Sequence, residues 1–226
     1  MKTESLGGFD RFRVPAALLV IAIHTGPLLS LNGEANYLLT DILARIAVPF
    51  FFSVSGWFLV PRLLREGRAA LIPFVKKLLL LYGAAVLLYL PLNLYNHTLE
   101  ESGFALLRDV LFNGTFYHLW YFPALVLGAC LVYGLLRILG PRWAWLPALL
   151  LYAAGLLGDS YFGLTAALPP LRAGYEALFL LFDYTRNGLF FGVMFIAMGA
   201  LFAQRTLYLK NWQVLLGFLL SAGLLF

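Results

Sequence analysis

Long apolar stretches separated by short charged clusters determine what this chain of 226 residues can fold into. The first stretch, residues 14–33, contains no Asp, Glu, Lys or Arg, and a helix that crosses a membrane needs about 20 such residues. The stretches lack the strict alternation that is typical of membrane barrels. We therefore predict an all-α, polytopic transmembrane helix bundle with six full spans and a truncated seventh. The predicted spans are 14–33, 42–61, 78–96, 119–136, 143–158 and 187–204, and the seventh begins at Asn211.

The composition excludes several other classes of protein. Hydrophobic residues make up 62% of the chain and charged residues 12%, whereas a soluble domain is about 45–50% apolar and about 25% charged. This chain therefore has too few charges to cover a soluble globule. Its 16% aromatic content also argues against intrinsic disorder. We find no linker or repeat, so residues 1–226 are expected to form one transmembrane domain.

The basic residues predict the orientation of the spans. Twelve of the sixteen lie in one set of connections, and alternate connections hold only Arg45, Arg108, Arg172 and Arg186. Connections rich in Lys and Arg face the cytoplasm, so the N-terminus is expected there. The net charge of +5 therefore reflects topology and does not indicate a nucleic-acid partner. The twelve are Lys2, Arg11, Arg13, Arg62, Arg65, Arg68, Lys76, Lys77, Arg137, Arg142, Arg205 and Lys210.

His24 is the strongest candidate for a functional residue, because an ionisable group inside a membrane is costly and often functional. It lies ten residues into the first predicted span, which is expected to place it halfway across the membrane. Arg13 precedes it by eleven residues, a rise of about 16 Å, and points along nearly the same helix face. The alternatives are a core histidine bonded to a neighbouring helix and an arginine that only anchors the helix end.

Other motifs are weaker when each is taken alone. Ser53, Ser55 and Gly56 in the second span are explained by close helix packing at least as well as by catalysis. His118 and Trp120 open the fourth span, where they form either an interfacial anchor or part of a site. Asp159 and Arg186 fall on the outer side and either bind a polar acceptor or pair with each other. No metal-ligand spacing or phosphate-binding loop is present, so no metal is expected.

Taken together, these residues resemble the acyltransferase-3 family of bacterial integral-membrane acyltransferases. The resemblance rests on Arg13 with His24, on the segment from Phe51 to Trp57, and on His118-Leu119-Trp120-Tyr121-Phe122. Within the family, the chain looks closest to the membrane domain of the serine racemases of vancomycin-resistance clusters. Five segments carry this closer likeness: residues 22–25, 47–52, 117–121, 158–161 and 183–188.

The resemblance implies an enzyme of the bacterial cytoplasmic membrane. It would transfer an acyl group other than an amino-acyl group from a cytoplasmic donor, usually acyl-CoA, to a small or carbohydrate hydroxyl acceptor at the cell envelope. His24 would act as general base, and His118 would lie on the acceptor side. Arg13 would hold the donor phosphates, with Lys76 and Lys77 as further donor-binding residues. No bound cofactor is implied. Lys76 and Lys77 stand where many members have a paired-arginine motif, so bidentate phosphate binding there is not expected.

The resemblance also predicts that the chain is C-terminally incomplete. The family fold has about ten spans, and the racemase relatives add a cytoplasmic pyridoxal-phosphate domain. Two other functions therefore stay open beside the acyltransferase. One is a membrane module that imports serine or delivers it to a fused or partner racemase domain, and the other is a non-catalytic membrane scaffold.

Overall fold

The computed structural model describes residues 7–98, 102–116 and 118–204, together with residues 210, 212–213 and 216. These residues form helices and turns, with no strand among them, which confirms the all-α prediction for this part of the chain. Of the predicted seventh span, only residues 212–213 and 216 are described, so the span as a whole lies outside the described residues. The helical segments are α1 (Gly7–Thr25), α2 (Gly33–Tyr37), η2 (Leu38–Leu43), η3 (Ala44–Ile46), α3 (Ala47–Glu66), α4 (Arg68–Tyr95), α5 (Gly103–Arg108), η4 (Asp109–Asn113), α6 (Tyr121–Trp143), α7 (Trp145–Leu157), α8 (Phe162–Ala166), α9 (Pro169–Leu178), η5 (Gly188–Gly192) and α10 (Val193–Gln204).

Three described helices are long and apolar enough to cross a membrane. They are Gly33–Glu66, which joins α2 to α3 without a break, then Arg68–Tyr95 and Tyr121–Trp143. Two further helices, Trp145–Leu157 and Gly188–Ala203, are apolar but shorter. The second and third of the long helices extend beyond the predicted spans, because Lys76, Lys77 and Arg137 continue their helices instead of ending them.

The first predicted span differs most from the structure. The sequence predicts a helix through residue 33, but α1 ends at Thr25. Gly26 has a φ of 53°, a conformation that glycine adopts far more readily than other residues, and Pro27 follows it. The chain then turns into α2. His24 is therefore in the last turn of α1 and not halfway along a span.

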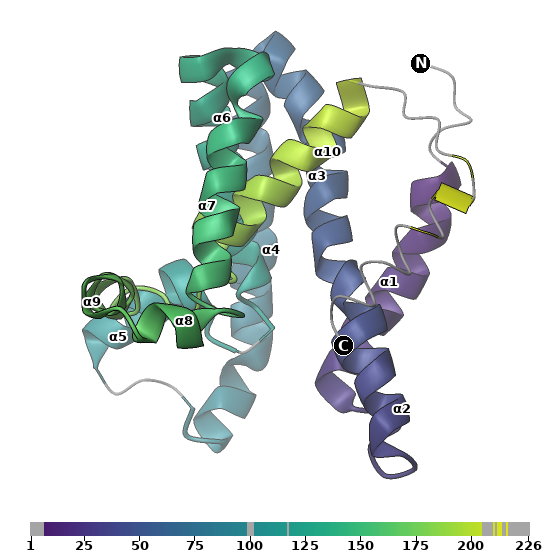
Figure 1. Cartoon of the computed structure of the whole chain (residues 1–226), viewed down its shortest axis with the longest axis vertical. Coiled ribbons are helices and arrows are strands. Elements are labelled where there is room, and N and C mark those ends of the chain that lie inside the picture. The colour runs from purple at the N-terminus through teal and green to yellow at the C-terminus, as the bar shows by residue number, and fades with distance from the viewer. Residues whose placement is uncertain are drawn as a thin grey trace.

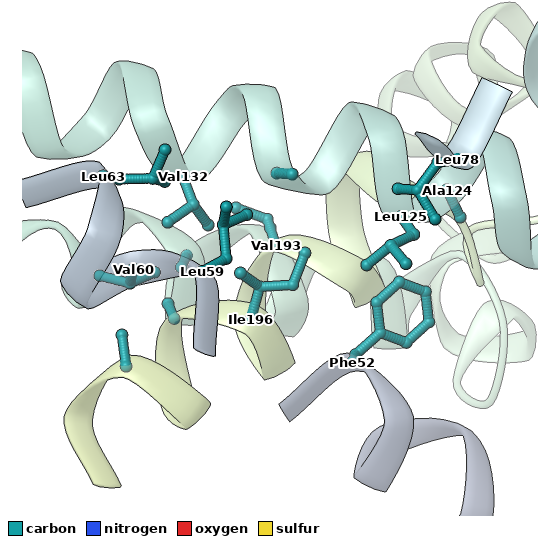
Figure 2. Packing of buried hydrophobic residues seen from close by; sticks show 14 of the residues in the cluster. Phe52, Leu59, Val60, Leu63, Leu78, Ala124, Leu125, Val132, Val193 and Ile196 are labelled. Carbon is teal, nitrogen blue, oxygen red and sulfur yellow. The ribbon is translucent and has the colours of Figure 1, made fainter. Parts of the chain in front are cut away.

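The helices pack in two groups that α10 connects (Figure 1). The helix α1 and the first part of α3 lie on one side, and α4, α6 and α7 lie on the other. The helix α10 crosses between them and contacts α3, α6 and α7. Side chains from α3, α6 and α10 point toward one another in the apolar core, among them Val60, Val132 and Ile196, each at most 2% exposed (Figure 2).

Candidate functional site

A cavity of about 630 Å³ lies between the two groups of helices. Its volume is within the range of about 300–1,000 Å³ that is usual for small-molecule sites. One side is formed by the end of α1 and by η2, η3 and the start of α3, and the other by α7, η5, α10 and the loops beside them. The residues that line it include Val20, His24, Asp41, Arg45, Pro49, Trp120, Asp159, Thr185 and Arg186.

His24 lines this cavity from the last turn of α1. Val20, one turn earlier, lines it as well, and Arg13 lies on the same helix face by helical geometry. The shared face that the sequence predicts is therefore consistent with the observed helix. His24 is an exposed residue of the chain, so its imidazole is accessible to a molecule in the cavity.

His118 lies beside His24, with 5.9 Å between the two ring centroids. It comes from the turn before α6, and aromatic rings hold it in place. The Tyr89 ring of α4 is 4.7 Å away and the Phe116 ring 5.1 Å away, both edge-on. Burial lowers the pKa of the His118 imidazole, and the neighbouring His24 lowers it further. Trp120, two residues later, lines the cavity directly.

Asp159 and Arg186 form an ion pair in the cavity wall, with 2.9 Å between the carboxylate and the guanidinium. The sequence places both residues on the outer side, and the structure brings them together from the end of α7 and the loop before η5. Arg186 also lies over the Tyr184 ring, 5.5 Å from its centroid. Both charged side chains remain partly exposed, at 46% for Arg186 and 33% for Asp159. Their charges are therefore available to a ligand.

The loop that carries Arg186 is fixed by hydrogen bonds. The Thr185 hydroxyl donates to the Gly155 carbonyl over 2.6 Å. The Asn187 side chain accepts from the backbone N–H groups of Leu189 and Phe190, which caps the start of η5. In the sequence, Thr185 and Asn187 contribute to the family resemblance and carry no predicted role in the site. Asn before a glycine-led helical segment is a capping signal that could have identified Asn187.

A second ion pair, which was not predicted from the sequence, lines the same cavity. Asp41 of η2 and Arg45 of η3 are 2.6 Å apart. From the sequence, Arg45 is predicted only as a basic residue of an outer connection. An acidic residue four positions before an arginine on a helix is a recognised pairing signal, and it could have identified this pair. The cavity is therefore lined by a cation and an anion from each of its two sides.

The predicted donor-binding residues lie outside the cavity. Arg13 pairs with Asp10 over 2.9 Å near the start of α1 and lines neither this cavity nor the smaller one described below. Lys76 and Lys77 are exposed on the first third of α4, and they also line neither cavity. These three cations can therefore contact only the part of a donor molecule that lies outside the cavity.

Gly56 packs α3 directly against α10. A Cβ atom on Gly56 would overlap the backbone carbonyl of Ile196, and one on Gly199 would overlap the backbone carbonyl of Ser53. The Ser55 hydroxyl donates to the Phe51 carbonyl over 2.9 Å within the same helix. These contacts support helix packing as the role of Gly56, and they leave the Ser55 hydroxyl bonded within its own helix. Gly199, on the partner helix, has no motif of its own in the sequence.

Replacing Gly56 with alanine should destabilise the protein by about 1–3 kcal/mol, because overpacking forces the two backbones apart. Gly83→Ala is the matched control. Gly83 lies in α4, and a Cβ there meets no atom within 4 Å, so this change should stabilise by about 0.5–1 kcal/mol. Thermal unfolding in detergent measures both. Equal unfolding temperatures for the two variants would contradict the packing role of Gly56.

The apolar helices and the charge-lined cavity between them are typical of a helical membrane protein with a small-molecule site. The family model described as an acyltransferase domain matches residues 6–226. The chain therefore belongs to the acyltransferase-3 family.

Three curated relatives match the chain, and each is named as a racemase. An amino-acid racemase of Enterococcus faecalis is 44% identical over 200 residues, which cover 88% of this chain and 28% of the relative. A serine/alanine racemase of Enterococcus gallinarum is 41% identical over 224 residues, which cover 95% of this chain and 31% of the relative. The chain thus spans less than a third of the length of these relatives. No solved structure matches it.

Proposed function

We propose that the chain is the membrane domain of an acyltransferase that moves an acyl group from acyl-CoA to a hydroxyl acceptor bound in the 630 Å³ cavity. The observation that carries the proposal is His24, which lines a cavity whose walls also hold two ion pairs. The acyltransferase-3 family membership supports the reaction class.

His24 acts in this proposal as the general base. Its imidazole removes the proton of the acceptor hydroxyl, and the acceptor oxygen forms a bond to the carbonyl carbon of the thioester. The carbon–sulfur bond then breaks, and the leaving thiolate takes up the proton that His24 holds. His118 supports this role because burial and the neighbouring His24 lower its pKa, which favours the uncharged imidazole beside a group that must accept a proton.

The two ion pairs hold the acceptor in this proposal. Asp159 and Arg186 on one side and Asp41 and Arg45 on the other offer hydrogen-bond donors and acceptors to a polar molecule. Trp120 adds an apolar surface to the same wall. Arg13 would bind the donor phosphates at the far end of α1, about 16 Å from His24 along the helix, and Lys76 and Lys77 would add positive charge on that side.

A second candidate function is favoured by the names of the relatives. A cavity with an anion and a cation on each side also suits an amino acid, which carries both charges. In that case the domain would bind serine and deliver it to a racemase domain. We expect no such transport. Cells that express the protein should take up labelled serine at the rate of cells with empty vector.

The uptake measurement separates the two candidates when an Arg186→Gln variant is included. If the unaltered protein takes up serine above the vector background, and Arg186→Gln takes up less, delivery of an amino acid is favoured over acyl transfer. Arg172→Gln is the control, because Arg172 forms an ion pair with Glu176 on the surface of α9 and does not line the cavity.

A further inference from the structure

A second, smaller cavity of about 340 Å³ lies between α1, α3 and α10. We call it the aromatic groove. Phe9 and Phe12 of α1, Phe50 and Trp57 of α3, and Met198 and Phe202 of α10 line it. Rings of α1 and α3 in this lining pack edge-on against each other, with centroids 5.1 Å apart for Phe9 and Trp57 and 4.8 Å apart for Phe12 and Phe50. Its walls are therefore suited to an apolar ligand.

The aromatic groove adjoins the cavity that His24 lines. Pro49, near the start of α3, lines both. From Ile46, the last residue of η3, to Trp57 of α3 the groove follows eleven residue steps, a length of about 16 Å. It leads away from the end of α1 that carries His24 and toward the end that carries Arg13. A linear molecule could lie in the groove with one end at Pro49, beside the cavity.

Ser53 gives the aromatic groove a polar atom one turn beyond Pro49. Its hydroxyl oxygen is buried and has no hydrogen-bond partner among the residues that the structure describes. Buried polar atoms are nearly always paired, so such an atom calls for an explanation. A rotation about χ1 of Ser53 that turns this hydroxyl into the groove would let it donate to the carbonyl oxygen of a thioester.

We infer that the aromatic groove binds the acyl chain of the donor, with the thioester near Pro49 and the tail toward Trp57. The inference rests on the proposed acyl transfer and adds the class of donor: a thioester of a medium or long apolar acyl chain. Three observations carry it: the aromatic lining, the wall shared with the His24 cavity, and the unpaired hydroxyl of Ser53.

Photo-crosslinking of the protein in its membrane tests the occupant directly. The probe is octanoyl-CoA with a diazirine at the end of the acyl chain, and mass spectrometry locates the label. We expect the label on residues of the aromatic groove. Excess unlabelled octanoyl-CoA should prevent this labelling, and excess acetyl-CoA should have little effect on it. The inference would be overturned if a diazirine phosphatidylcholine labelled the groove as strongly as the octanoyl-CoA probe and octanoyl-CoA did not compete with it. A membrane lipid would then be the occupant.

Narrowing the groove tests the same inference by donor selectivity. Val54→Phe adds volume inside the groove and should lower transfer from octanoyl-CoA by about tenfold or more relative to acetyl-CoA. Leu64→Phe is the control, because Leu64 is an exposed residue of α3 that lines neither cavity. A parallel loss for both donors in Val54→Phe, with normal insertion, would contradict a role in chain selection.

The two experiments separate failure of the inference from failure of the proposed function. Specific labelling of the groove without any ester product would leave the groove assignment intact and overturn acyl transfer. Ester formation from acetyl-CoA with no octanoyl label in the groove would leave acyl transfer intact and overturn the groove assignment.

Discussion

Replacing His24 with alanine should lower the rate of acyl transfer by roughly a hundred- to ten-thousand-fold, the usual contribution of a positioned general base. The imidazole lines the cavity at the end of α1, and no other described histidine lines it. The loss should appear in kcat, because the side chain acts on the proton of the acceptor and not on the donor. Transfer from labelled acyl-CoA into alkali-labile esters measures it.

The control for His24→Ala is His97→Asn. His97 follows the end of α4 and lines neither cavity, and asparagine tolerates its φ of 52° better than most residues. This variant should transfer acyl groups at the normal rate. Normal activity in His24→Ala, with normal insertion into the membrane, would show that His24 is not the base.

Reversing the charge of Arg186 should have the second-largest effect. In Arg186→Asp, two carboxylates would face each other in the cavity wall, where Asp159 now lies 2.9 Å from the guanidinium. Because neighbouring charges couple by about 0.5–3 kcal/mol, we expect the KM for the acceptor to rise by about tenfold or more. The double reversal Asp159→Arg with Arg186→Asp should recover part of that loss.

The pair Arg172 and Glu176 provides the matched control for this reversal. Its ion pair is 2.7 Å long, but both side chains are more than half exposed and neither lines the cavity. Exposed pairs contribute little, so Arg172→Glu with Glu176→Arg should leave acyl transfer unchanged. An equal rise of the KM in both double reversals would mean that Asp159 and Arg186 act through general surface charge and not on the acceptor.

The sequence predicted the helical class well because its signals are local. Apolar stretches of sufficient length require helices in a membrane whatever their neighbours are. The exact ends were less predictable. The structure ends α1 at Thr25, although the apolar pattern continues beyond it. The positive φ of Gly26 ends the helix there and overrides the side-chain pattern.

The candidate site was predictable in part. His24, Trp120, Asp159 and Arg186 all line one cavity, and the sequence identified each of them. It could not show that Asp159 pairs with Arg186, because 27 positions separate them and the contact depends on how α7 packs against η5. Gly199 was missed for the same reason, since only the approach of Ser53 on α3 explains why it must be small.

The most direct test of acyl transfer compares two activities of the protein in the same membranes. Labelled acetyl-CoA and octanoyl-CoA are supplied in one sample and labelled serine in another, each with empty vector and with His24→Ala. We expect alkali-labile acyl esters above the vector background, their loss in His24→Ala, and serine uptake equal to the vector. Serine uptake above the vector with no ester from either donor would contradict the assignment of this cavity to acyl transfer.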